Sequence, residues 1–466
     1  MSTHYDIAVI GTGPGGYIAA LKAAQLGAKV LVVEKSKDVG GTCLNFGCIP
    51  SKALLASAHL KHEIDHAKDF GINVAGEVEV DWKKIQKRKD RVLRRLRSGI
   101  QNLFKARNID LIAGHGRLKG KGKIEVEGKT YEADNIILAV GSVPARIPGW
   151  PEDPEKVCTS DEALHWKTLP ESLLIVGGGV IGCEFACMMQ ALGVDVTVVE
   201  MLPRLLPEMD KDLGPELAKT FKSRKIAIHT DTKVDALDAD DNGCTAKLSN
   251  GETIQTERVL VAVGRRPNTA DVGLETVGLE TDRGFLRVDE YMMTKAPGVY
   301  CIGDANGSCL LAHAASAQGV AAVRNALGHD EPFTSPIPGA VYTFPEVAGV
   351  GMTEQAVVEK DIPFSIGHFP IGYLGKAMAA GVEEGFVKVL RHRETDAIIG
   401  VHMLGHNVTE CVAAAGTLLH TEASVEDMAE VVFAHPSISE SVKEAAEDAL
   451  GAALHLPPRK VIQMTD

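Results

Sequence analysis

The first part of the chain alternates between buried-strand and helical patterns. Continuous apolar runs at residues 6–10 and 29–34 flank a helical stretch that extends through Leu26 and ends at Gly27. Short apolar runs bounded by glycine are typical of strands buried on both faces of a parallel sheet. The order strand, helix, strand therefore predicts a βαβ unit.

A glycine-rich turn joins the first of these strands to the helix. Its glycines are Gly11, Gly13 and Gly16, and Glu34 closes the second strand. In this arrangement the first glycine makes the turn, the second lets a pyrophosphate approach the backbone, and the third lets the helix pack on the strand. A carboxylate at the end of the second strand is placed to bind a ribose hydroxyl. These residues predict a dinucleotide-binding site.

The same unit recurs in the middle of the chain. A strand at residues 173–176 leads into a second glycine turn, a helix and a strand that ends at Glu200. The acid follows the turn at the same spacing as in the first unit, and the glycines of the turn are Gly177, Gly179 and Gly182. Two units with matching spacing predict two dinucleotide-binding sites.

A proline-rich joint and a change of pattern divide the chain further. The joint spans Pro148 to Pro151, and from Pro338 onwards alternating strands such as residues 385–390 are joined to helices, which is typical of an α+β domain. The predicted fold class is α/β, with two Rossmann-like dinucleotide-binding domains and a C-terminal α+β domain. We expect boundaries that give the segments 1–150, 151–272, 273–340 and 341–466.

Composition and charge narrow the classes of partner. The chain has 466 residues and a formal net charge of -13, which argues against nucleic acid as the main partner. The one basic run, residues 83–97, alternates with apolar positions and predicts a solvated amphipathic helix, with a docking surface for an acidic partner as the alternative. We find no signal peptide and no apolar run of transmembrane length, so we expect a protein of the cytoplasm or an equivalent reducing compartment, without membrane contact.

Two cysteines in the stretch Gly40–Lys52 are candidates for redox chemistry. Cys43 and Cys48 flank Gly47 at the expected start of a helix, where exposed N–H groups favour a thiolate. Lys52 follows Cys48 by four residues, so the two side chains share one helix face. The alternative is a pair of ordinary buried cysteines.

A second cysteine pair has a spacing that could suit a metal ion. Cys183 and Cys187 lie four residues apart, but no cluster of His or Cys accompanies them in the sequence. We interpret them as core residues and predict no metal site.

Together these motifs resemble the class I flavin-dependent pyridine nucleotide-disulfide oxidoreductases, and among them the dihydrolipoamide dehydrogenases. The most specific elements are the stretch Gly40–Lys52 and the stretch His435–Glu440. The resemblance implies that the first glycine turn binds FAD and the second binds NAD. The four segments would then be an FAD-binding domain with the redox disulfide, an NAD-binding domain, a central domain completing the FAD site, and a dimer-interface domain.

The resemblance also implies contacts to both cofactors. Those to FAD are Gly11, Gly13, Gly16, Glu34, Lys35, Gly41, Thr42, Lys52, Gly116, Asp304 and Ala312. Those to NAD are Gly179, Gly182, Glu200, Val234 and Gly264. The chain departs from the family pattern at Gln318, where many relatives carry an acid, and at residues 305–309.

The catalytic roles follow from the same resemblance. A dihydrolipoyl thiol would give its proton to His435 of the partner subunit, which Glu440 would orient, and the thiolate would attack a disulfide between Cys43 and Cys48 at Cys43. Electrons would pass from Cys48 to the flavin and then to NAD. Lys52 would pair with Glu184 beside the flavin.

The implied partners are a second copy of the chain, the lipoyl domains and the core acyltransferase of 2-oxo acid dehydrogenase complexes, and the glycine cleavage system as a further use. One alternative is a reductase that uses NADPH. Glu200 disfavours it because a carboxylate repels a 2′-phosphate, whereas Arg204 favours it. Another alternative is a binding component that docks on a multienzyme core and whose catalysis is incidental.

Overall fold

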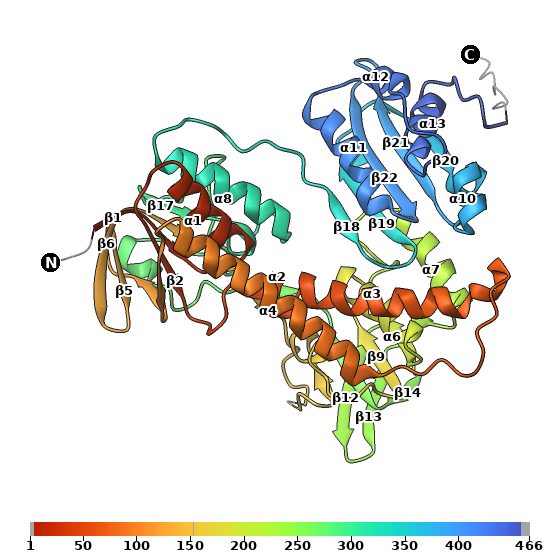
Figure 1. Cartoon of the computed structure of the whole chain (residues 1–466), viewed down its shortest axis with the longest axis horizontal. Helices are drawn as coiled ribbons and strands as arrows, with labels where there is room; N and C mark the ends of the chain where they lie inside the picture. Colours follow the sequence, from red (N-terminus) through yellow and green to blue (C-terminus); the bar gives the residue numbers. More distant parts are fainter. Residues whose placement is uncertain (1–3, 152, 458–466) are drawn as a thin grey trace. The chain divides into compact units, whose positions relative to one another are not determined.

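The computed structural model describes residues 4–151 and 153–457. The chain forms two compact units, each built from two separate stretches (Figure 1). Unit 1 comprises residues up to 170 and residues 260–334, and unit 2 comprises residues 171–259 and the remainder from 335. Among the described residues, no helix is long and apolar enough to cross a membrane. The four-segment division expected from the sequence stays a prediction.

Unit 1 is organised around a seven-stranded sheet whose central strands are parallel. The strand order is β3-β2-β1-β6-β5-β4, and β17 pairs with β6. The two expected strands of the first βαβ unit are confirmed as the parallel pair β1 and β2. The strands are β1 (His4–Ile10), β2 (Val30–Glu34), β3 (Asp110–Ala113), β4 (Gly116–Leu118), β5 (Lys123–Val126), β6 (Lys129–Leu138) and β17 (Val299–Cys301).

Alternate residues of these strands supply two separate cores, one on each face of the sheet. Ile7 and Val9 of β1 belong to a cluster that includes alanines of helix α1 (Pro14–Gln25). Ala8 and Ile10 belong to the cluster on the other face. Both faces are covered, as the continuous apolar pattern of the strand predicts.

Helix α8 (Ala312–Ala326) lies beside α1 in unit 1 (Figure 1). The two backbones approach through glycines, because a Cβ on Gly319 would lie 2.7 Å from the carbonyl oxygen of Gly15. Because neither Gly15 nor Gly319 has a side chain, α8 can pack closely against α1 in the same helical layer.

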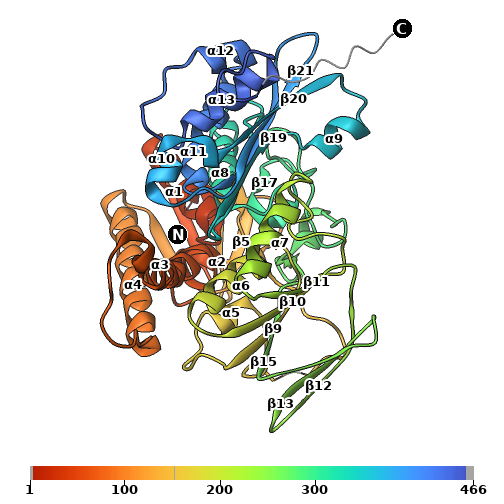
Figure 2. The same ribbon diagram turned by 90° about the vertical axis from the view of Figure 1, so that its right-hand side faces the viewer.

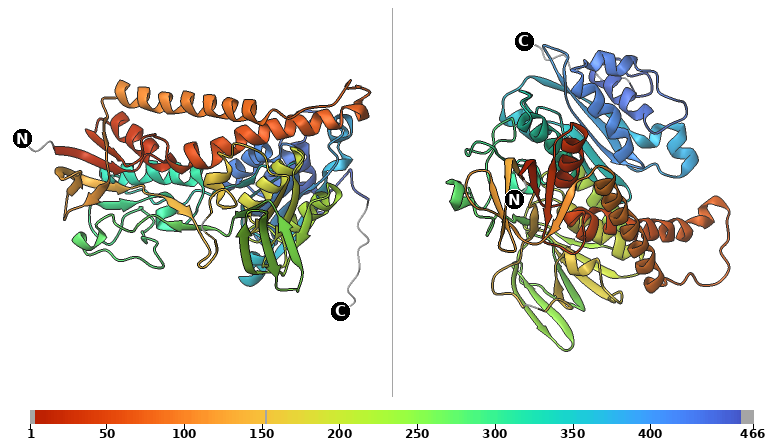
Figure 3. Two further views of the ribbon diagram at one scale, coloured as in Figure 1. Left: turned by 90° about the horizontal axis from the view of Figure 1, so that it is seen from below. Right: turned by 60° about the vertical axis from the view of Figure 1, so that its left-hand side comes forward.

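The basic run forms the expected amphipathic helix, α4 (Trp82–Ala106), which packs beside α3 (Cys48–Asp65) (Figure 3). The side chain of Asp81 caps its N-terminus by accepting a hydrogen bond from Lys84 N at 2.9 Å. The buried face consists of residues that recur at helical spacing, including Trp82, Lys89, Leu93, Ile100 and Phe104.

The first stretch of unit 2 repeats the βαβ arrangement. Strands β9, β10 and β11 lie side by side and pair in parallel, which confirms the second unit expected from the sequence. A small antiparallel sheet follows. The elements are β9 (Ser172–Val176), α6 (Val180–Ala191), β10 (Asp195–Val199), α7 (Leu213–Ser223), β11 (Ala227–His229), β12 (Val234–Asp240), β13 (Gly243–Leu248) and β14 (Thr253–Thr256). The chain returns to unit 1 along β15 (Arg258–Val261).

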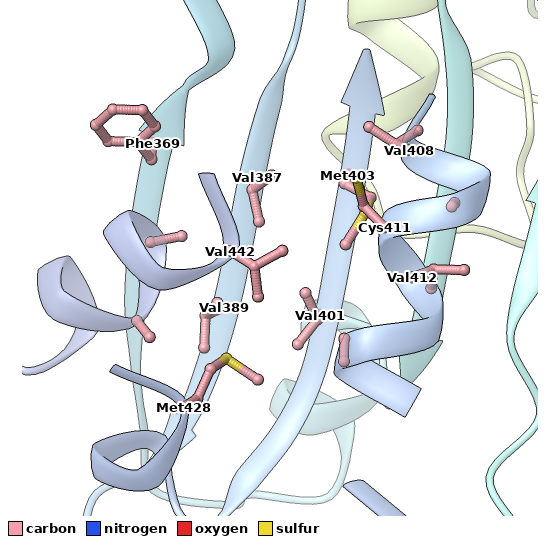
Figure 4. Packing of buried hydrophobic residues seen from close by; sticks show 14 of the residues in the cluster. Phe369, Val387, Val389, Val401, Met403, Val408, Cys411, Val412, Met428 and Val442 are labelled. Atoms are coloured by element: carbon pink, nitrogen blue, oxygen red, sulfur yellow. The ribbon is translucent and has the colours of Figure 1, made fainter. Parts of the chain in front are cut away.

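The second stretch of unit 2 is an antiparallel sheet of order β18-β19-β22-β21-β20 with helices packed on it, as expected for an α+β domain (Figure 2). In Figure 4, Val387 and Val389 of β21 and Val401 and Met403 of β22 meet apolar side chains of three helices, among them Val442. The elements are β18 (Gly339–Val341), β19 (Glu346–Gly351), α9 (Glu354–Glu359), β20 (Phe364–Pro370), α10 (Gly375–Ala380), β21 (Phe386–His392), β22 (Ile398–Gly405), α11 (Val408–His420), α12 (Val425–Glu430) and α13 (Glu440–Ala449).

A buried ion cluster joins the two stretches of unit 2. Lys388 of β21 is 1% exposed, and its Nζ donates to Asp210 at 2.8 Å, to Asp212 at 2.6 Å and to Glu354 at 2.5 Å. Burial alone would lower the pKa of Lys388, but these carboxylates outweigh it and raise the pKa. Burial likewise opposes ionisation of Asp210, yet its charged and hydrogen-bonding partners, His402, Lys388 and the Glu354 N–H, lower its pKa.

We predict that Lys388→Met destabilises the protein by about 3–5 kcal/mol, because it leaves the buried Asp210 carboxylate without its counter-charge. The measurement is the thermal unfolding midpoint. Lys376→Met is the matched control, since Lys376 is an exposed lysine of the same unit. Equal midpoints for the two variants would show that the cluster does not stabilise unit 2.

Candidate active site

The redox segment of unit 1 consists of two helices joined by Gly47. Cys43 lies inside the short helix α2 (Gly41–Phe46), and Cys48 is the first residue of α3. The sequence predicted a single helix start, whereas the structure separates the cysteines into two helices. A Cβ on Gly47 would lie 3.2 Å from the Thr42 carbonyl oxygen, so the bend between the helices is tighter than most side chains allow. Both cysteines are half-buried.

The two thiols of this segment lie within hydrogen-bond distance of each other. The hydrogen bond with Cys48 and burial raise the pKa of the Cys43 thiol, while the nearby Lys52 ammonium acts in the opposite direction. Two sulfur atoms in such contact are close enough to exchange between a dithiol and a disulfide with little movement. The arrangement is therefore suited to accept and release an electron pair.

A buried asparagine that the sequence analysis missed fixes helix α2 between the two cysteines. Asn45 is 2% exposed, and its Nδ2 donates to the carbonyl oxygens of Val39 at 3.1 Å and Gly41 at 2.8 Å. Its Oδ1 accepts a hydrogen bond of 2.6 Å from Arg97 Nε of α4, and Arg97 also pairs with Asp38 at 3.0 Å. The signal in the sequence was a polar residue between two large apolar residues, Leu44 and Phe46.

The first glycine turn leaves open space where a phosphate group would approach. A Cβ on Gly16 would lie 2.0 Å from the Gly11 carbonyl oxygen, so only glycine permits this contact between turn and helix. A Cβ on Gly13, the N-cap of α1, would instead meet nothing within 4 Å. Open space at the N-terminus of a twelve-residue helix fits the pyrophosphate of FAD.

Glu34 is buried at the end of β2 and organises this turn. One carboxylate oxygen accepts hydrogen bonds from the Thr12 N–H at 2.9 Å and from the Thr12 hydroxyl, and the other accepts from the Ser36 N–H at 2.8 Å. A carboxylate offers about four lone-pair sites, so a ribose hydroxyl can still be accepted.

The remaining residues assigned to FAD also lie in unit 1. Asp304 accepts a hydrogen bond from the Ser142 hydroxyl, which in turn accepts one of 2.7 Å from Arg265 Nε. Ala312 is the first residue of α8. Elsewhere in the unit, Lys35 follows β2, Gly41 and Thr42 lie in α2, Lys52 in α3 and Gly116 in β4.

Gln318, where the chain departs from the family pattern, belongs to a local network of hydrogen bonds. Gln318 is 1% exposed, and its Oε1 accepts from Gly303 N at 2.7 Å and from Asn306 Nδ2 at 3.0 Å. Its Nε2 donates to the Ser308 hydroxyl at 2.9 Å. Neutral amides and hydroxyls thus satisfy each other here, and no buried carboxylate is needed to hold the loop before α8.

The second glycine turn, in unit 2, has the same stereochemistry as the first. A Cβ on Gly182 would lie 1.9 Å from the Gly177 carbonyl oxygen, and a Cβ on Gly179 would meet nothing within 4 Å. Glu200 is buried and accepts from Gly178 N at 2.6 Å and from Leu202 N at 2.7 Å. The turn therefore fits a second dinucleotide, with a carboxylate at the expected position for a ribose.

The structure says less about the other residues that the sequence analysis assigned to NAD. Val234 begins β12 in unit 2, and Gly264 lies in unit 1, so its assignment stays a prediction. Arg204, which had favoured NADPH, donates from Nη2 to the Pro207 carbonyl oxygen at 3.1 Å. Its guanidinium is thus engaged by its own loop.

His435 and Glu440 form a hydrogen-bonded pair in unit 2. The imidazole is 80% exposed, and its Nδ1 lies 2.8 Å from Glu440 Oε1, while Ser437 N donates to Oε2 at 2.7 Å. Burial would raise the pKa of Glu440, but the hydrogen bonds from Ser437 and His435 lower it. Because an ionised carboxylate only accepts hydrogen bonds, the geometry fits a proton on Nδ1, and Nε2 is the ring nitrogen left for another partner.

Glu184 and the second cysteine pair lie in helix α6. Glu184 is 5% exposed, and its Oε1 accepts a hydrogen bond of 3.0 Å from Tyr342 N. Lys52 belongs to unit 1, so the Lys52–Glu184 pair stays a prediction. Cys183 and Cys187 are buried, and burial raises the pKa of Cys187 to about 12, as the interpretation of core residues implies.

The chain matches two families of known proteins. Residues 5–319 match the family described as pyridine nucleotide-disulphide oxidoreductase, and residues 337–446 match its dimerisation domain. The second match supports assembly as a homodimer.

Relatives and solved structures agree with this match. The dihydrolipoyl dehydrogenase of Bacillus subtilis is 41% identical, over 98% of this chain and 100% of its own length, and that of Thermus scotoductus is 40% identical, over 97% and 99%. The crystal structure of LpdA from Mycobacterium tuberculosis superposes with a TM-score of 0.88 at 29% identity, covering 95% of this chain and 99% of LpdA. These findings confirm the resemblance seen in the sequence and the fold class.

The two glycine turns fit the cofactors that such enzymes use, FAD and NAD. The matches span nearly all of the chain, and the paired thiols are suited to the disulfide chemistry for which the family is named. This chain is therefore an enzyme of the pyridine nucleotide-disulphide oxidoreductase family.

Proposed function

We propose that the chain is a dihydrolipoyl dehydrogenase, which oxidises protein-bound dihydrolipoyl groups to lipoyl groups with NAD as the acceptor. The observation that carries the proposal is the hydrogen-bonded thiol pair of Cys43 and Cys48 beside the charge of Lys52. The names of the relatives at 40–41% identity support the choice of substrate. Glu200 at the second turn supports NAD over NADP.

The cofactor sites follow from the glycine turns. Gly11, Gly13 and Glu34 would hold the ADP half of FAD, and Gly179, Gly182 and Glu200 would hold NAD. Bound FAD supplies the two-electron relay that links thiol chemistry to hydride chemistry.

The chain's own residues perform the thiol exchange. The first dihydrolipoyl thiol gives its proton to Nε2 of His435 of the partner subunit, and the thiolate attacks Cys43 Sγ. The Cys43–Cys48 bond breaks as the bond from substrate sulfur to Cys43 forms, and Cys48 leaves as a thiolate. The second substrate thiol then displaces Cys43, which takes up a proton. The substrate dithiol has become a cyclic disulfide, and the protein disulfide has become two reduced sulfurs.

Two charges assist these steps. The Lys52 ammonium favours the thiolate form of the pair, since it opposes the rise in the pKa of Cys43. The Glu440 carboxylate holds the imidazole of His435 by Nδ1, which keeps Nε2 as the proton acceptor. Because the pKa of Glu440 is lowered, this orientation persists across neutral pH and is lost only as the pH falls below the usual glutamate range, about 4.

The cellular setting belongs to the same proposal. The enzyme would act as a homodimer in the cytoplasm and serve the lipoyl domains and core acyltransferase of 2-oxo acid dehydrogenase complexes, with the glycine cleavage system as a further use. The match to a dimerisation domain supports the dimer. A binding component that docks on a multienzyme core and whose catalysis is incidental is the alternative, and activity of the isolated dimer separates the two.

We expect the purified dimer to oxidise dihydrolipoamide with NAD and to work poorly with NADP. Cys43→Ser and Cys48→Ser should each lower kcat on the order of 10⁴-fold or more, because each removes one sulfur of the exchange. Steady-state assays with both nucleotides provide the measurement, and Cys411→Ser serves as the control at a cysteine outside the site. Normal turnover in either active-site variant would exclude the disulfide mechanism.

We expect His435→Gln to lower kcat by about 10²-fold or more, through loss of the proton acceptor. Glu440→Gln should lower kcat by a smaller factor, since the imidazole remains but loses its charged partner. The chain offers a close control, because His455 Nδ1 pairs with Glu444 at 2.8 Å and is also exposed. His455→Gln should leave turnover unchanged. A similar loss in His435→Gln and His455→Gln would show that neither histidine is specific to the reaction.

We expect Glu34→Ala to weaken FAD binding by about 10-fold to 100-fold. The substitution leaves the Thr12 and Ser36 N–H groups without their acceptor, at about 1–3 kcal/mol for such a group, and 1.4 kcal/mol corresponds to a factor of ten. The flavin absorbance per purified chain and a titration of the flavin-free protein measure this. Glu77→Ala, at an exposed glutamate of unit 1, is the control. Unchanged flavin retention in Glu34→Ala would contradict the assignment of the first turn to FAD.

A further inference from the structure

One strongly charged surface remains unexplained by the proposed reaction. Helix α4 carries ten Lys and Arg residues and a single acid, which gives a net charge of +9 within a chain of net charge -13. The residues that we call the basic stripe follow one face of the helix, opposite its buried face. They are Lys83, Lys87, Arg91, Arg94 and Arg95, and all are exposed.

The basic stripe has few counter-charges within the chain. Over the described residues, no carboxylate makes an ion pair with Lys87, Arg91, Arg94 or Arg95. Elsewhere on α4, by contrast, Lys84 pairs with Asp81 at 3.0 Å and Arg97 with Asp38 at 3.0 Å. The stripe is therefore left available to a partner.

The spacing of the stripe is unfavourable for the isolated helix. Lys83, Lys87, Arg91 and Arg95 succeed each other at four-residue intervals, which places like charges next to each other on the surface. Like-charge pairs at this spacing cost about 0.2–0.5 kcal/mol each. These repulsions lower the stability of the helix, and no ion pair with Lys87, Arg91 or Arg95 in the described part of the chain offsets them. Such an arrangement of charges points to a role in binding another molecule.

The helix that carries the stripe is held rigidly on unit 1. Lys89 is 1% exposed and donates to the Leu164 carbonyl oxygen at 2.9 Å, and the Trp82 indole donates to the Trp166 carbonyl oxygen at 2.8 Å. At 25 residues and 1.5 Å per residue, α4 is a rod of about 37 Å. The stripe thus runs along a helix that is anchored to unit 1.

The same helix contacts the redox segment directly. Arg97 donates to Asn45, which lies between Cys43 and Cys48, and Arg88 donates to the Ala53 carbonyl oxygen of α3 at 2.9 Å. A partner bound along the stripe would be held beside the helices that carry the two thiols. This location fits the partner that must deliver a dithiol to them.

We infer that the basic stripe of α4 is the docking surface for the protein domain that carries the dihydrolipoyl group, and that this domain is acidic on the face it presents. The inference rests on the proposed function. The remainder of the chain is strongly negative and repels an acidic domain, while the stripe attracts it, so the charges orient the encounter as well as accelerate it.

The test compares the same dihydrolipoyl group in two substrates. One is free dihydrolipoamide, and the other is a recombinant lipoyl domain of negative net charge in its dihydrolipoyl form. Lys87→Glu with Arg91→Glu should lower kcat/KM for the lipoyl domain by about 10-fold or more and leave kcat/KM for free dihydrolipoamide unchanged. In the wild type, kcat/KM for the domain alone should fall as salt rises towards about 0.15 M. Lys121→Glu with Lys129→Glu changes the net charge equally at two exposed lysines outside α4 and should have no effect on either substrate.

The outcomes separate the two proposals. Absent turnover of free dihydrolipoamide would contradict the proposed function, whereas calorimetric binding of the lipoyl domain tests the docking surface independently of turnover. An equal loss with the control pair, an equal loss on both substrates, or unchanged domain kinetics in the α4 variant would overturn the docking inference. So would binding of wild type, but not of the variant, to vesicles of anionic lipid with no change in domain kinetics.

Discussion

The contact between two glycines in each βαβ unit is the constraint on which both cofactor sites depend. The carbonyl oxygen of Gly11 occupies the space of a side chain at residue 16, and that of Gly177 occupies the space at residue 182. Each contact draws the N-terminus of a helix against the end of a strand. The open position at Gly13 or Gly179 then lies where backbone N–H groups converge. The second site repeats the first because the same steric requirement is met twice.

A buried acid completes each of these turns. Glu34 accepts from the backbone of Thr12 and Ser36, and Glu200 accepts from that of Gly178 and Leu202. The carboxylates therefore shape the turns before any nucleotide is bound, and the ribose meets an acceptor that is already oriented. This preorganisation lowers the cost of ordering the loop on binding.

Local patterns in the sequence predicted most of the fold and much of the candidate site. Glycine spacing and strand-length apolar runs are short-range signals, and the structure places both within the expected elements, whereas it divides the Cys43–Cys48 segment between two helices. The contact of Arg97 with Asn45 joins positions 52 residues apart, and that of Lys388 with Asp210 joins positions 178 apart. Such partners depend on tertiary packing, which residue spacing does not encode. The bend between α2 and α3 was missed because a helix-start signal does not distinguish one helix from two.

The buried Lys388 cluster has a consequence for how such enzymes can be recombined. Asp210 comes from the nucleotide-binding stretch and its buried counter-charge, Lys388, from the antiparallel sheet near the C-terminus. A chimera that takes the nucleotide-binding stretch from this chain and the other stretch from a relative without a cation at this position would bury the Asp210 carboxylate without its counter-charge. The two stretches of unit 2 therefore have to be inherited, or exchanged, as a pair.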